Sequence, residues 1–84
     1  MHDRDLQQAR EAARPSPLTP AERLGMRIVA KRLDANLTQE KVFLAAGISR
    51  NTYQRIESGK GDARFSHLLR IATVLGCHVR DLIP

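Results

Sequence analysis

Four polar side chains between residues 50 and 55 could hydrogen-bond the edges of nucleic-acid bases. They are Arg50, Asn51, Gln54 and Arg55. An arginine can donate two hydrogen bonds to guanine, and an asparagine or glutamine can form two with adenine. Tyr53 and Ile56 lie three residues apart and would share a core-facing side of a helix. The spacing therefore predicts a short helix that packs on one side and presents base-reading groups on the other.

Two short helices around a tight turn are expected to position this face, between Thr38 and Ser58. Thr38 is a suitable N-cap for the first helix, and Ser49 is one for the second. Gly47 can adopt a positive φ without steric cost, so it is expected to end the first helix. The apolar positions of that first helix are Val42, Ala45 and Ala46.

The flanking sequence predicts further helices. Thr19 to Glu22 forms a capping-box signal with proline at the first helical position, and that helix should run to about Ala35. Asn36 tolerates the left-handed conformation that would end it. Residues 59–62 predict a loop, followed by a helix that ends at Gly76 and by a last short helix near His78. The expected core residues of the fourth helix are Phe65, Leu68, Leu69, Ile71, Ala72 and Leu75.

These residues resemble the phage-repressor-like helix-turn-helix family, also called the Cro or XRE family. The resemblance covers about Leu24 to Ile83. It implies an all-α, five-helix repressor-like DNA-binding domain at residues 19–84. Residues 1–18 are expected to be an N-terminal arm and linker; their composition is helix-forming, and prolines stand at positions 15 and 17. The matching segments are Leu37–Glu40, Gly47–Ser49, Ile56–Lys60, Leu68–Ala72 and Leu75–Gly76.

The resemblance implies a sequence-specific DNA-binding regulator that is expected to act as a repressor and to bind double-stranded DNA as a homodimer. Bases would be read by Arg50, Asn51 and Arg55, with Gln54 pointing outward near them. Contacts with the DNA backbone fix register without reading sequence. The residues expected to make these backbone contacts are Thr38, Gln39, Thr52, Ser58, Lys60 and Arg64; Arg64 matches a position that can also reach the minor groove.

Arg32 and Glu57 are expected to form a structural ion pair between the first helix and the end of the recognition helix. Family members commonly pair Arg and Glu at these positions. The residues give an independent reason: Arg32 follows the Leu24–Ile28 core face by one turn, and Glu57 neighbours the core residue Ile56. Both charges should be partly buried, and a buried charge needs a partner.

Several residues depart from the family pattern. Phe43 stands where alanine is usual and Tyr53 where isoleucine or valine is usual, and both are interpreted as core residues. Leu44 is expected to be exposed. Met26, Val29 and Leu33 form a second apolar stripe on the first helix. That stripe is either a widened core or a contact surface. The alternative function is therefore an antitoxin-like or partner-binding module. It would use residues 1–19 and the stripe to bind another protein and would retain DNA binding for autoregulation.

The composition limits the number of domains and the classes of function. The 84 residues suit one domain, and the net charge of +5 favours a polyanionic partner. The single cysteine excludes an internal disulfide. No metal-ligand spacing, paired carboxylates, activated nucleophile or phosphate-binding loop is recognised, so the sequence predicts no enzyme, no metal and no cofactor. No apolar run is long enough to span a membrane. A cytoplasmic location is expected, in a bacterial or phage-encoded protein.

Overall fold

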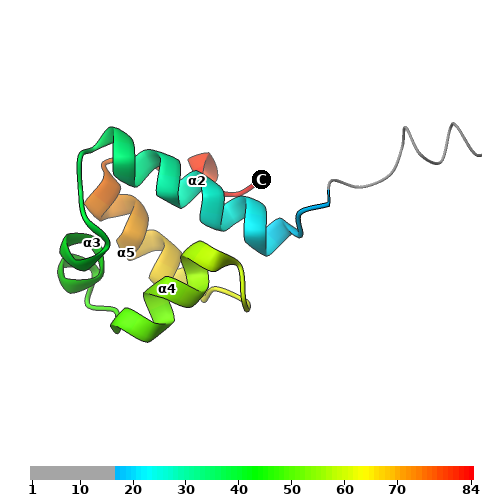
Figure 1. Cartoon of the computed structure of the whole chain (residues 1–84). Coiled ribbons are helices and arrows are strands. Elements are labelled where there is room, and N and C mark those ends of the chain that lie inside the picture. Colours follow the sequence, from blue (N-terminus) through cyan, green and yellow to red (C-terminus); the bar gives the residue numbers. More distant parts are fainter. Residues whose placement is uncertain (1–16) are drawn as a thin grey trace, which may run out of the picture.

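A computed structural model describes residues 17–84, which are helical and contain no strand. The elements, in chain order, are α2 (Pro20–Asp34), α3 (Gln39–Ala46), α4 (Arg50–Ser58), α5 (Phe65–Leu75) and the 3-10 turn η1 (Val79–Asp81) (Figure 1). The arm predicted at residues 1–18 lies almost wholly outside the described part of the chain.

The prediction of five helices is wrong for the described residues, which hold four α-helices and one 3-10 turn. The segment expected to form the fifth helix is η1. The backbone N–H of His78 donates to the Asp81 carboxylate at 2.9 Å, and the helical turn ends after three residues. Ile83 precedes Pro84, and a residue before proline is disfavoured in the α region, so the helix cannot continue.

The predicted helix starts are confirmed by their capping hydrogen bonds. The hydroxyls of Thr19, Thr38 and Ser49 accept from backbone N–H groups three residues on, at 3.1, 3.1 and 3.2 Å. Gly47 ends α3 at φ 67°, and Asn36 adopts φ 57° after α2. The hydroxyl caps pair N–H groups at the helix starts, and the N–H groups of Gly47 and Asn36 donate to the Leu44 and Leu33 carbonyls at the ends of α3 and α2, so these helix ends are set locally.

The hydrophobic core lies between two helix pairs: α2 packs on α4, and α3 packs on α5 (Figure 1). Tyr53 and Phe43 are both buried, as the sequence interpretation proposed, and Leu44 is exposed. Arg27 of α2 donates to the Ile83 carbonyl at 3.1 Å, which holds the C-terminal segment beside α2. The fully buried side chains at the centre are Ile28, Val42, Tyr53, Ile71 and Leu82.

Three expected core residues are on the surface instead. Phe65 is 59% exposed and Leu69 is 46% exposed, and Ala45 is also exposed. The helix α5 buries one stripe only, and Leu69 lies outside it, while Phe65 is the first residue of the helix. In α3, the buried residues are Val42, Phe43 and Ala46, and Ala45 lies outside the face that they form. The buried stripe of α5 consists of Leu68, Ile71, Ala72 and Leu75.

The crossing of α2 and α4 depends on two glycines. Gly25 is buried in the middle of α2, and a Cβ there would lie 2.2 Å from the Glu57 carbonyl oxygen. Gly59 ends α4 at φ 70°, and a Cβ there would lie 2.5 Å from the Cα of Glu22. The two backbones therefore approach more closely than any side chain would permit. Sequence analysis assigned no role to Gly25, because a glycine inside a helix carries no local signal of what crosses it.

We predict that Gly25→Ala lowers the free energy of unfolding by about 1–3 kcal/mol, because the new methyl group meets backbone that cannot move without separating the helices. This loss outweighs the roughly 1 kcal/mol by which alanine favours an isolated helix over glycine. The melting temperature should fall accordingly in thermal unfolding followed by circular dichroism.

Gly61→Ala is the matched control. Gly61 lies in an exposed loop, and the nearest atom to its Cβ is the mobile end of the Arg55 side chain, at 3.2 Å. The melting temperature of the Gly61→Ala variant should stay close to that of the wild type. Equal stability of the Gly25→Ala variant and the wild type would show that the two helices are not held at this distance.

Candidate nucleic-acid interface

The helix α4 places its polar residues on the surface while Tyr53 and Ile56 anchor its other side. Arg50, Asn51 and Gln54 are exposed. Ser49 caps α4 immediately after the turn from α3, so Arg50 and Asn51 are the first two residues of the helix that follows the turn (Figure 1). The chain thus has the geometry of a recognition helix whose N-terminal side chains are available to a groove.

Arg50 is held in place by two side chains of α3. Its Nη2 lies 3.7 Å from the Glu40 carboxylate, and its guanidinium carbon lies 5.3 Å from the centre of the Phe43 ring. A cation over an aromatic face is attracted by the ring quadrupole. Phe43 therefore contributes to the core and also supports the exposed Arg50. The sequence interpretation of Phe43 as structural missed this second contact, because residues 43 and 50 lie on different helices.

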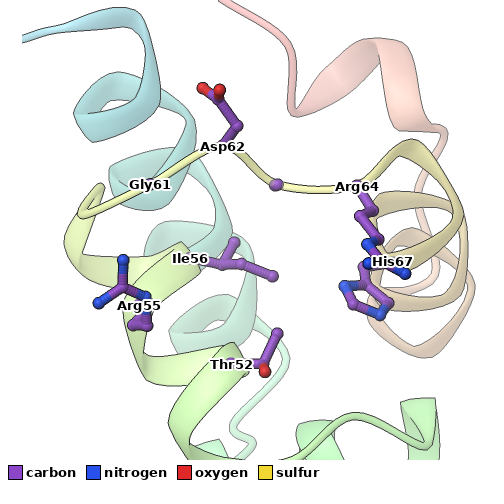
Figure 2. Close-up of a pocket in the computed structure, with 8 residues that line it drawn as sticks. Thr52, Arg55, Ile56, Gly61, Asp62, Arg64 and His67 are labelled. Atoms are coloured by element: carbon purple, nitrogen blue, oxygen red, sulfur yellow. The ribbon is translucent and has the colours of Figure 1, made fainter.

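Arg55 differs from its three neighbours, because its guanidinium is turned toward the loop after α4. Its Nη2 donates to the Lys60 carbonyl at 2.8 Å. The side chain borders an open cleft of about 410 Å³ between α4 and the start of α5 (Figure 2). In Figure 2, Arg55 and Thr52 extend from α4, while Arg64 and His67 extend from the α5 side. The cleft is lined by Thr52, Arg55, Ile56, Gly61, Asp62, Ala63, Arg64 and His67.

The residues expected to contact the DNA backbone lie on α4 and on both sides of it in the chain. Thr38, Lys60 and Arg64 are exposed. Thr52 is half-buried and accepts a hydrogen bond from the Ser49 hydroxyl at 2.9 Å. Ser58 is exposed, and its hydroxyl donates to the Arg55 carbonyl at 3.2 Å. Gln39 is also half-buried, and its side-chain amide donates to the Glu57 carboxylate.

The Glu57 carboxylate is the centre of a buried polar network beneath α4. Arg32 donates to it through Nε at 2.8 Å and through Nη2 at 3.2 Å, and the side chains are only 12% and 5% exposed. Gln39 donates to it at 2.8 Å, and the Tyr53 hydroxyl donates as well. Arg32 also donates to the Leu37 carbonyl at 3.0 Å. The network therefore joins α2, the turn after it, α3 and α4.

Burial and hydrogen bonding act in opposite directions on the pKa of Glu57. Desolvation is the largest single effect and raises the pKa of this carboxyl, since burial disfavours the charged form. The hydrogen bonds from Arg32, Tyr53 and Gln39 lower it, and together they prevail, so the pKa lies below its ordinary value. Burial, followed by the hydrogen bond to Glu57, raises the pKa of Tyr53. Glu57 is thus ionised and Tyr53 neutral at pH 7.

Comparison with known proteins identifies the class. Residues 28–82 match the helix-turn-helix family model, so the chain belongs to this family, of the Cro and XRE type. The restriction-modification controller protein C.AhdI from Aeromonas hydrophila has a similar structure. It is 25% identical, with a TM-score of 0.72, and the match covers 75% of this chain and 96% of that chain. No curated protein matches in sequence.

The family and the structural match together establish a DNA-binding transcriptional regulator and point to a non-enzymatic one. Among residues 17–84, no three His, Cys, Asp or Glu side chains gather as metal ligands would. No helix in the same range has the length and apolar character to span a membrane.

We predict that Glu57→Gln lowers the free energy of unfolding by about 3–5 kcal/mol at pH 7, because Arg32 is left as a buried charge without its counterion. The folded pKa of Glu57 lies below the ordinary value of 4.5. Its stabilising contribution is therefore complete above that value and is lost as the pH falls through the folded pKa. Urea unfolding of variant and wild type at several pH values measures both effects, and the difference between them should narrow below pH 4.5.

Glu40→Gln provides the control, since Glu40 and Arg50 form an ion pair with both side chains more than half exposed. Exposed pairs contribute about 0–1 kcal/mol, so this variant should unfold almost as the wild type does. If the two variants lost the same small amount of stability, the buried pair would not be a structural determinant.

Proposed function

We propose that this protein represses transcription by binding a specific operator with α4 in the major groove. The observation that carries the proposal is the exposure of Arg50, Asn51 and Gln54 on one helix whose other side is anchored in the core. Arg50 would donate to guanine, and Asn51 or Gln54 would pair with adenine. Arg55 joins this set when its guanidinium leaves the Lys60 carbonyl, which is a contact at the protein surface.

Cationic and hydroxyl groups on either side of α4 would fix the protein on the duplex. Lys60 and Arg64 follow α4, and Thr38 precedes α3. Thr52 and Ser58 lie on α4 itself and carry hydroxyl groups that can donate to phosphate. Contacts of this kind hold orientation and make affinity depend on salt, but they do not read sequence. The net charge of +5 supports the same conclusion.

A twofold dimer is the proposed DNA-binding form. One recognition helix covers only a few base pairs, and related proteins read two half-sites about one helical turn apart. Three apolar sets could supply the interface: the exposed Ile83 at the C-terminus, the stripe on α2 in which Met26 and Leu33 are exposed and Val29 is half-buried, and the exposed pair Phe65 and Leu69 on α5. The similarity to C.AhdI favours a regulator of restriction-modification genes. Such a protein would act in the cytoplasm.

A second candidate is an antitoxin-like role in which another protein is gripped through residues 1–19 and the stripe on α2. The exposure of Met26, at 57%, and of Leu33, at 63%, favours it. DNA binding would then serve autoregulation. Affinity capture with the full chain distinguishes the two roles, because a stoichiometric protein partner lost in a Met26→Ser, Leu33→Ser variant is expected only for the second.

Operator binding should separate base reading from phosphate contact. We expect Arg50→Ala to lose about 1–3 kcal/mol of binding free energy and to relax preference at one base pair, because its donors to guanine are removed. Lys60→Ala should weaken binding to all sequences alike and reduce the salt slope by about one unit. Both are measured by titrating a selected duplex and its single-base variants at several salt concentrations. An unchanged preference profile in the Arg50→Ala variant would contradict the proposed role of Arg50.

Sedimentation of the protein with its selected duplex tests the dimer. We expect two protein chains on each duplex, with a twofold-symmetric footprint, because one helix reads too few base pairs to discriminate. A one-to-one complex on an asymmetric site, at protein concentrations well above the dissociation constant, is the result that excludes the dimer.

A further inference from the structure

The buried Glu57 carboxylate has no acceptor capacity left. Its Oε1 receives hydrogen bonds from Arg32 Nη2, at 3.2 Å, and from Gln39 Nε2, at 2.8 Å. Its Oε2 receives hydrogen bonds from Arg32 Nε, at 2.8 Å, and from the Tyr53 hydroxyl. A carboxylate offers about four lone-pair sites and donates nothing, so these four donors saturate it. Every polar group in hydrogen-bond contact with the Glu57 carboxylate must therefore be a donor.

This requirement determines which end of the Gln39 amide faces inward. An amide has an acceptor oxygen and a donor nitrogen, and either can be placed in a given position by rotating the group. Here the nitrogen must face Glu57, because the oxygen in its place would meet the carboxylate with like charge. The oxygen Oε1 of Gln39 is thereby turned outward, toward the exposed face of α4.

The outward oxygen in turn orients Gln54. Gln54 Nε2 donates to Gln39 Oε1 at 3.4 Å, and Gln54 is fully on the surface. The second N–H of that nitrogen and the Gln54 oxygen are not used by this contact. One donor and one acceptor in that arrangement are the groups with which a glutamine pairs with adenine.

We propose that Gln39 is a positioning residue, which transmits the polarity of the buried Glu57 carboxylate to the base-reading amide of Gln54. This inference deepens the proposed function and rests on it for the role of Gln54 at a base. It changes the expected role of Gln39 from a contact with phosphate to a link between the core and the reading face. Gln54 donates to Gln39, and Gln39 donates to Glu57. The reverse direction is excluded because the Glu57 carboxylate has no hydrogen to donate.

The test uses Gln39→Met, which retains the length and packing of the side chain and removes its amide. Binding of the full chain to a selected duplex and to all its single-base variants gives a preference profile. Gln54→Ala should reduce preference at one base pair about five- to hundredfold. Gln39→Met should reduce preference at the same base pair about threefold or more and leave the position read by Arg50 unchanged. The double variant should be no less selective there than Gln54→Ala alone, because the two residues act in one chain.

Two other results would overturn the inference. Uniform weakening on all duplexes with a smaller salt slope would make Gln39 a phosphate contact only. A lower melting temperature with an unchanged profile would make it a structural residue only. Glu57→Gln, where it folds, provides a second variant: it should flatten preference at the Gln54 base pair, since a glutamine at 57 no longer requires a donor from Gln39.

A measurement on the free protein separates failure of this inference from failure of the proposed function. In ¹H–¹⁵N spectra, the side-chain amide signal of Gln54 should move in Gln39→Met, while that of Asn51, on the same helix, should stay in place. If the Gln54 signal does not move, the hydrogen bond between the Gln54 and Gln39 amides is absent, whatever the protein binds. If it moves but Gln54→Ala leaves the DNA profile intact, the amide coupling stands and the assignment of Gln54 to a base is wrong.

Discussion

A buried carboxylate organises the part of this domain that we propose as the DNA-binding surface. Glu57 lies near the end of α4, and its partners come from α2, from the start of α3 and from α4 itself. An ionised group is costly to bury, and only saturating hydrogen bonds with a counterion make it stable there. Any displacement of α4 relative to α2 would break the bidentate contact with Arg32. The angle of the recognition helix is therefore tied to a specific polar geometry, whereas apolar packing alone tolerates small shifts.

The same contact depends on the absence of side chains at the helix crossing. Gly25 lets α2 approach the backbone of α4 at Glu57, and Gly59 lets the end of α4 approach Glu22. A longer separation would move Arg32 away from the carboxylate that it neutralises. The close approach and the ion pair thus require each other. This explains why a glycine, which weakens a helix by about 1 kcal/mol relative to alanine, stands in the middle of α2.

The side chains of the proposed reading face are not equivalent. Arg50 rests over Phe43 beside Glu40, and Gln54 is bonded to Gln39, so both are partly ordered before any DNA is present. Arg55 is directed to the loop after α4 and borders the cleft with Arg64 and His67. Side chains held in advance lose less conformational freedom on binding, and this favours discrimination between bases.

Local signals in the sequence determined the helix boundaries, because caps such as Thr19, Ser49 and Gly47 act within a few residues of where they stand. The spacing of polar and apolar residues in α4 likewise predicted one packed side and one polar side, and the class of protein followed from the resemblance of the motif residues to a known family. Tertiary structure decided what depends on contacts between helices: the need for glycine at position 25, the exposure of Phe65 and Leu69, and the ring of Phe43 beneath Arg50. It also decided the orientation of Gln39. An amide can point either way, and only the carboxylate that α4 brings to it from eighteen residues away fixes the direction.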